Sequence, residues 1–95
     1  MKYHYVYILL SLKDDYFYDG YTNNLLKRLE KHNKGLVVVT KNRTPFILIF
    51  FEAYLNQKDA LAREKYFKSG WGRSHLKKVL KYYLCSKHGG CSSAG

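Results

Sequence analysis

The sequence is poor in acidic residues: seven Asp and Glu stand against 17 Lys and Arg, which gives a formal net charge of +10. It has one proline and two cysteines, Cys85 and Cys91, both near the C-terminus, which excludes a disulfide-rich framework. No apolar run is long enough to span a membrane, and no secretory signal follows Met1. We therefore expect a cytoplasmic protein with reduced thiols and no membrane partner.

The chain is rich in positive charge. A charge of +10 on 95 residues predicts a polyanionic partner, and nucleic acid is the leading candidate. The basic residues are spread along the chain rather than gathered on one amphipathic helix, which argues against an anionic membrane surface. Charge alone favours a basic RNA-binding protein over an enzyme.

The apolar pattern predicts one α+β domain over residues 1–84 and a disordered Ser/Gly-rich tail over residues 85–95. We expect a small central three-stranded antiparallel sheet flanked by helices, in the order β-β-α-β-α-α. The strands are predicted at 3–10, 16–22 and 46–51, and the helices at 23–34, 56–69 and 74–84. Because residues 46–51 are continuously apolar, this strand is expected at the centre of the sheet.

Glycines and small polar residues predict where the helices begin and end. Gly35 is expected to end the first helix, Gly70 and Gly72 to end the second, and Ser74 to cap the third. The apolar stripe of the first helix is expected at Leu25, Leu26 and Leu29.

Glu64 is the most informative single position. Helical spacing places it on one stripe with Ala60, Phe67 and Trp71. Since Phe67 and Trp71 are expected to face the sheet, Glu64 faces it too. A carboxylate on an apolar face is costly unless it is paired or bound to a cation. An ion pair with a basic residue and a role as metal ligand both remain open.

The other acidic residues narrow this choice. Most have a local role in a turn, at a helix cap or in an exposed pair, which leaves three candidate ligands: Asp19, Glu52 and Glu64. Mg²⁺ can be held by one carboxylate together with waters and a substrate phosphate. One protein ligand is then enough in a chain with so few acids.

Arg28 and His32 are four residues apart and share one face of the first helix. The planar guanidinium of arginine suits a phosphate, because it donates two parallel hydrogen bonds. A solvated basic face is the alternative, since Lys27 and Lys31 lie on the same helix. For His32, a solvated or capping histidine is equally open.

Tyr7 and Tyr18 lie on the first two predicted strands, and Gly20 follows Tyr18 closely. They form either an aromatic cross-strand pair or a site where a phenol activates a water molecule. A phenol titrates near pH 10, so the second role requires nearby positive charge. Lys41 and Arg43 are predicted contacts to backbone phosphates, with a charged loop as the alternative.

Together these residues resemble the GIY-YIG nuclease superfamily, and its small single-domain UPF0213 subgroup in particular. The resemblance runs from Tyr3 to about Leu84. The matching positions are Tyr5-Val6-Tyr7, Tyr18-Asp19-Gly20, Thr22, Arg28, His32, Asn33, Thr40, Lys41, Arg43, Pro45, Arg63-Glu64-Lys65 and Gly70-Trp71-Gly72-Arg73. Three departures stand out. Tyr5 replaces the first glycine, Asp19 replaces an apolar residue, and the late asparagine of many members has no counterpart beyond Ser74.

The resemblance implies an endonuclease that hydrolyses phosphodiester bonds in DNA with one divalent metal ion, in repair or recombination. Glu64 would hold Mg²⁺ or Mn²⁺, and Tyr7, helped by Tyr18 or His32, would activate the water. Arg28 would stabilise the transition state. Lys27, Lys31, Lys41 and Arg43 would bind the nucleic acid. The alternative is a non-catalytic nucleic-acid-binding module on the same fold. Cys85, His88 and Cys91 lack the fourth ligand of a closed zinc site.

Overall fold

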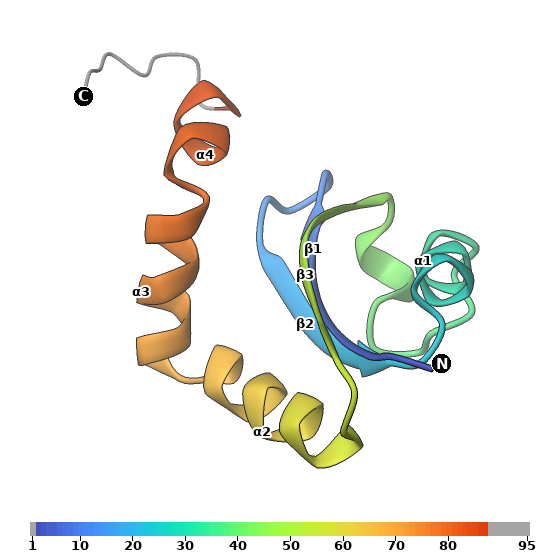
Figure 1. Cartoon of the computed structure of the whole chain (residues 1–95). Coiled ribbons are helices and arrows are strands. Elements are labelled where there is room, and N and C mark those ends of the chain that lie inside the picture. The colour runs from blue at the N-terminus through green and yellow to red at the C-terminus, as the bar shows by residue number, and fades with distance from the viewer. Residues whose placement is uncertain (1, 88–95) are drawn as a thin grey trace. The chain divides into compact units, whose positions relative to one another are not determined.

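The computed structural model describes residues 2–87, and it confirms the predicted α+β class (Figure 1). The elements are β1 (His4–Ser11), β2 (Phe17–Thr22), α1 (Leu25–Asn33), the 3-10 helix η1 (Lys41–Arg43), β3 (Phe46–Tyr54), α2 (Gln57–Lys68), α3 (Gly70–Val79) and α4 (Lys81–Lys87). The predicted order is confirmed, with one further helix. Two compact units divide the chain after Lys65. Within residues 2–87, no helix is long and apolar enough to cross a membrane.

The three strands form one antiparallel sheet in the order β2-β1-β3. The expectation that residues 46–51 form the central strand is wrong, because β1 pairs with both other strands. β1 has a continuous apolar run of its own and is buried from Val6 to Ser11. β3 lies at an edge, where Phe51 is 50% exposed. Both β1 and β3 therefore have a continuous apolar run, but only β1 has a neighbouring strand on each side.

α1 covers one face of the sheet (Figure 1). The core of this face consists of Tyr7 and Leu9 from β1 and Phe46 from β3. The residues packed against this core are Tyr18, Leu25, Leu29 and Leu48. Leu26 is 78% exposed and does not belong to the apolar stripe, because Leu25 and Leu29, four residues apart, already occupy the buried side of this short helix.

The opposite face carries Val6, Ile8 and Leu10 of β1, all of them buried. Glu52 of β3 lies opposite Val6 in the strand register. Arg63 of α2 donates two hydrogen bonds to this carboxylate, Nε to Oε1 at 2.8 Å and Nη2 to Oε2 at 3.2 Å. This bidentate ion pair fastens the middle of α2 to the edge strand.

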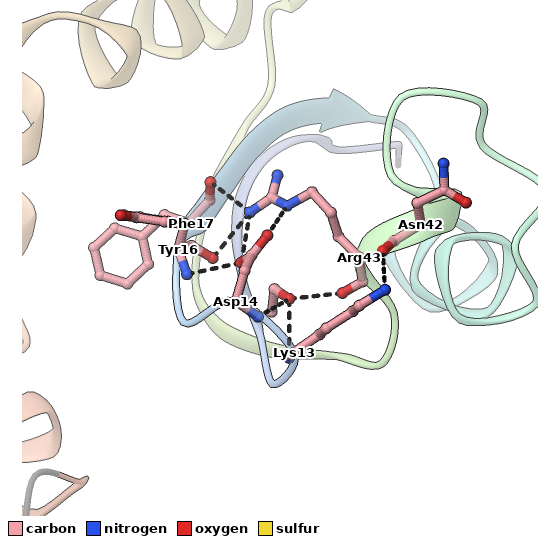
Figure 2. A network of polar contacts seen from close by, with 7 residues as sticks. Lys13, Asp14, Tyr16, Phe17, Asn42 and Arg43 are labelled. Carbon is pink, nitrogen blue, oxygen red and sulfur yellow. Dashed lines mark hydrogen bonds and ion pairs between the residues drawn. The ribbon is translucent and has the colours of Figure 1, made fainter.

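Side-chain contacts fasten the turn between β1 and β2 to η1, and we call this network the turn clamp (Figure 2). Arg43 donates to both carboxylate oxygens of Asp14, Nε to Oδ2 at 2.6 Å and Nη2 to Oδ1 at 3.3 Å, and also to two backbone carbonyls before and at the start of β2. Ser11 Oγ donates to the Arg43 carbonyl at 2.6 Å, and Lys13 Nζ donates to the Asn42 carbonyl at 2.9 Å. The Arg43 guanidinium holds the pKa of Asp14 at about 2.

Gly35 ends α1, as predicted. Its φ of 74° is the left-handed conformation that glycine adopts without strain. Its amide donates to the carbonyl of His32 at 3.1 Å, and the next amide, of Leu36, donates to Lys31 at 3.0 Å. These two bonds form a Schellman motif, which satisfies carbonyls at the helix end.

The junction between α2 and α3 differs from prediction. Gly70 and Gly72 do not end a helix but lie in the first turn of α3, and Ser69 rather than Ser74 is its cap. The Ser69 hydroxyl accepts a hydrogen bond from the Gly72 amide at 3.3 Å. A side chain at Gly72 would collide with the backbone of Tyr66, so this glycine permits a tight junction between two helices.

Trp71 is 81% exposed, so the prediction that it shares a stripe with Phe67 is wrong. The helical period starts again in α3, and spacing counted from α2 does not carry across the break. Ala60 and Phe67 are buried as predicted. Helix α4 extends to Lys87, into the expected tail.

Cys85 lies in α4. His88 and Cys91 lie outside the described residues.

Candidate active site

Three residues predicted to be catalytic meet on the α1 face of the sheet. The phenol oxygen of Tyr7 on β1 lies 3.0 Å from Nε2 of His32 on α1. The rings of Tyr18, on β2, and His32 are 5.2 Å apart between centroids. Tyr7 and His32 are both buried. Side chains from β1, β2 and α1 therefore meet around the hydrogen bond between Tyr7 and His32.

Gly20 makes room for this arrangement. It lies directly opposite Tyr7 in the register of β1 and β2, and a Cβ at Gly20 would lie 2.6 Å from Cζ of the Tyr7 ring. Real Cβ atoms do not come this close to another heavy atom. The Tyr7 ring therefore crosses the backbone of Gly20, and the missing side chain lets its hydroxyl reach His32.

Thr40 fixes the other side of the His32 ring. Its Oγ1 lies 2.7 Å from Nδ1 of His32, and both residues are buried. Burial, with a smaller effect from the charge of Arg28, lowers the pKa of His32 to about 4. The imidazole is therefore neutral near pH 7, with one donor and one acceptor nitrogen.

The tautomer follows from the hydrogen-bond network. The Thr40 hydroxyl donates to the Val37 carbonyl at 3.5 Å, so it accepts from Nδ1 of His32. Nε2 is then the acceptor, and the Tyr7 hydroxyl donates to it. His32 is thus oriented to receive the proton of the Tyr7 phenol.

The charges of the remaining predicted residues act on the same phenol. Burial is the largest effect and raises the pKa of Tyr7 well above its usual range, and Tyr18 raises it further. Arg28 lowers this pKa through its charge and a hydrogen bond, whereas the carboxylate of Glu64 raises it. The other four residues predicted to be catalytic therefore all act on the Tyr7 hydroxyl.

The structure separates the three candidate metal ligands. Glu52 is committed to Arg63, and it also accepts from the Tyr54 hydroxyl at 2.6 Å. Asp19 is buried opposite Ile8, on the other face of the sheet from the neighbouring Tyr18. Glu64 is half-buried on α2 and is the candidate whose charge acts on Tyr7.

Among residues 2–87, no three His, Cys, Asp or Glu residues lie together as a metal site. A divalent ion held by Glu64 would take its other ligands from water and phosphate oxygens. Mg²⁺ and Mn²⁺ suit such an oxygen-rich shell. The donor set therefore fits a hard ion that is shared with the substrate.

A cationic hollow of about 100 Å³ lies at the start of α1. Its lining residues are Thr22, Asn23, Asn24, Lys27, Arg28 and Lys31. Lys27 and Lys31, both predicted to bind nucleic acid, are thus beside Arg28. Lys41 is exposed on η1. The guanidinium of Arg43 is instead directed at Asp14, within the turn clamp.

Sequence reasoning gave no role to two residues that position the site. Thr40 orients His32, and Asn33 exchanges two hydrogen bonds with the backbone of Phe46: Oδ1 accepts from the amide at 2.7 Å and Nδ2 donates to the carbonyl at 3.0 Å. Neither residue follows an apolar period. The only signal was their place in the family resemblance, which includes both.

A family model described as the GIY-YIG catalytic domain matches residues 3–79. The chain belongs to the GIY-YIG family. This GIY-YIG domain is similar to the UPF0213 protein of Pediococcus pentosaceus, with 42% identity over 76 residues, 79% of this chain and 80% of that protein. It is also similar to the UPF0213 protein CPE1444 of Clostridium perfringens, with 46% identity over 65 residues, 67% of this chain and 69% of that protein.

The fold of the GIY-YIG domain also has a solved counterpart. The solution NMR structure of the UPF0213 protein BH0048 from Bacillus halodurans is similar to it with a TM-score of 0.51 and 34% identity. The similarity covers 81% of this chain and 84% of that one. The chain is therefore a small GIY-YIG domain of the UPF0213 kind.

Proposed function

We propose that this GIY-YIG domain is a metal-dependent endonuclease that hydrolyses phosphodiester bonds in DNA. One observation carries the proposal: the buried Tyr7 hydroxyl donates to a neutral His32, while the charges of Arg28 and Glu64 both act on it. A protein that only binds nucleic acid gains nothing from a carboxylate beside its phosphate-binding face, because that charge repels phosphate.

Each residue has a distinct role in the proposed reaction. His32 accepts the hydrogen bond of the Tyr7 hydroxyl and so fixes the direction of the phenol, whose oxygen, once ionised, takes a proton from a water molecule. Arg28 favours the ionised phenol and presents a planar fork to the scissile phosphate. A divalent ion at Glu64 would stabilise charge on the phosphate and offset the carboxylate that raises the pKa of Tyr7.

Substrate binding in this proposal is mainly electrostatic. Lys27, Lys31 and Lys41 would contact backbone phosphates, so affinity should fall steeply with salt and sequence preference should be weak. We propose cytoplasmic DNA repair or recombination as the setting. We leave Arg43 out of these contacts, because its Nε and Nη2 donors are engaged by Asp14 and by backbone carbonyls.

A non-catalytic nucleic-acid-binding module is the second candidate. The raised pKa of Tyr7 favours it, because a protonated phenol is not a base. Under this alternative the tyrosines and His32 would serve only to pack α1 on the sheet.

A cleavage assay separates the two candidates. Branched, single-stranded and duplex DNA would be incubated with the wild type, Tyr7→Phe and Glu64→Gln, in Mg²⁺, in Mn²⁺ and in EDTA. Glu30→Gln is the matched control, since Glu30 is an exposed acid paired with Lys34 on α1. We expect metal-dependent cleavage by the wild type and the control, and a loss of at least about 100-fold in the other two variants. Binding without cleavage by any of the proteins would favour the binding module. Equal cleavage by Glu64→Gln would overturn the metal assignment.

A further inference from the structure

A second hollow adjoins the cationic one, and the two share Asn23 and Asn24. It has a volume of about 450 Å³, and its lining residues are Tyr5, Asn23, Asn24, Leu25, Leu26, Leu48 and Phe51. We call it the aromatic groove. Its volume is within the range of small-molecule sites, which is roughly 300–1,000 Å³.

The walls of the groove are apolar although they face solvent. Leu26 is 78% exposed and Phe51 is 50% exposed. The rings of Tyr5 and Phe51 meet edge to face, with centroids 6.0 Å apart. Clustered apolar residues that remain in contact with water mark a binding surface more often than a packing fault.

The groove continues the face of the sheet that carries Tyr7. Tyr5 precedes Tyr7 by two residues on β1, so the two side chains point to the same side. Phe51 lies opposite Tyr7 in the register of β1 and β3. A nucleic acid whose phosphate lies in the cationic hollow therefore has the aromatic groove directly beside that phosphate.

We propose that the aromatic groove binds an unpaired nucleobase of the substrate, with the adjoining phosphate in the cationic hollow. This inference rests on the proposed function and specifies the substrate class. Apolar walls with aromatic rings take the flat face of any base, whereas bases inside a duplex already stack on each other and cannot enter. The substrate is then single-stranded DNA, or DNA with an unpaired nucleotide next to the cleaved bond.

The rim of the groove is polar on the side shared with the cationic hollow. Oδ1 of Asn24 caps α1 by accepting from the Lys27 amide at 3.1 Å, which leaves the Nδ2 group of Asn24 to donate. Asn23 is exposed. Amide side chains can hydrogen-bond the edge of a base. Because an amide both donates and accepts, the two asparagines can pair with different bases, which fits the weak sequence preference proposed above.

Binding is tested in EDTA, so that cleavage does not enter the measurement. Anisotropy of a labelled single-stranded 12-mer is compared with that of a blunt duplex hairpin, for the wild type, Phe51→Ala and Leu26→Ser. Val38→Ser is the matched control, because Val38 is also 78% exposed. Phe51→Tyr restores an aromatic ring and serves as the rescue variant.

We expect Phe51→Ala to weaken single-strand binding about tenfold and Leu26→Ser to weaken it less, since stacking on an aromatic ring contributes on that order. Hairpin binding, the control and the rescue variant should stay near the wild type. The salt dependence of Phe51→Ala should be unchanged, because no charge is removed. Equal losses on both DNAs, or no loss on either, would overturn the groove assignment. So would a dimer in sedimentation that Phe51→Ala dissociates, because the groove would then be a self-association surface.

The inference and the proposed function fail in different ways. Preferential single-strand binding that depends on Phe51, without any cleavage in Mg²⁺ or Mn²⁺, supports the groove and rejects the nuclease. Cleavage that depends on Glu64, together with single-strand binding that does not change in Phe51→Ala, supports the nuclease and rejects the groove.

Discussion

Tyr7 and His32 are 25 residues apart in sequence, and a hydrogen bond of 3.0 Å joins the phenol oxygen of one to Nε2 of the other. Each ring supports the position of the other: Tyr7 projects from the central strand, and His32 projects from the helix that covers it.

Burial of His32 makes stability depend on pH. Its pKa is about 4 in the folded chain against 6.5 for an exposed histidine. Between these values the unfolded chain binds a proton that the folded chain does not, so stability should fall as pH drops from 6.5 to 4, by about 3 kcal/mol at most. Urea unfolding across this range measures the effect. His32→Gln should flatten the pH dependence. An identical pH profile in His32→Gln would contradict the assignment.

Gly20→Ala should displace the Tyr7 ring, because the new methyl group would occupy the space of that ring. We expect a loss of about 1–3 kcal/mol in the free energy of unfolding. Cleavage should fall at least about 100-fold, since small displacements of catalytic groups have effects of this size. Gly70→Ala is the control: a Cβ there meets nothing within 4 Å, and alanine favours helix. Wild-type activity in Gly20→Ala would show that the position of the phenol does not matter.

Asn33→Ala should destabilise the fold by about 1–3 kcal/mol, because it leaves the amide and carbonyl of Phe46 without their side-chain partners. Chemical denaturation with an unchanged m-value would measure the loss. Asn42 takes part in the turn clamp through its backbone carbonyl, so Asn42→Ala should be nearly neutral. Similar losses in both variants would mean that the amide pairing at Phe46 contributes little.

Lys31→Gln and Arg43→Gln each remove one positive charge but should differ in DNA binding. Lys31 lines the cationic hollow, whereas the Arg43 guanidinium is held by Asp14. We expect Lys31→Gln to lower the slope of log affinity against log salt by about one, and Arg43→Gln to leave it unchanged. Titrations at several salt concentrations measure the slopes. An equal change in slope for Arg43→Gln would show that Arg43 also contacts DNA phosphates.

The sequence was sufficient for the class of fold and for the pairing of β1 with β2. These depend on local signals: alternation of apolar residues, a short polar turn and the glycine that ends α1. It was not sufficient for the position of β3. Continuous apolar residues indicate that a strand is buried, but they do not show which other strands it pairs with, and this pairing decides the strand order. The central strand is β1, which is buried from Val6 to Ser11.

The sequence likewise placed some residues of the candidate site but not others. Helical spacing correctly placed Arg28 and His32 on one face. Elimination left Asp19, Glu52 and Glu64 as candidate ligands, and only the folded chain shows that Glu52 is engaged by Arg63. Spacing failed for Trp71, because a new helix begins one residue before it and resets the period. Thr40 lies in a loop without any periodic pattern, and only the folded chain shows that its hydroxyl touches His32.

The loop between α1 and β3 is fastened at both ends, by Asn33 to Phe46 at one and by the turn clamp at the other. A segment held in this way loses little further conformational freedom when substrate arrives. Thr40, which lies within it, therefore already sets the orientation of the His32 ring in the empty protein. The chain bears the entropic cost of ordering this part of the site when it folds, and binding energy from the substrate is left for the reacting groups.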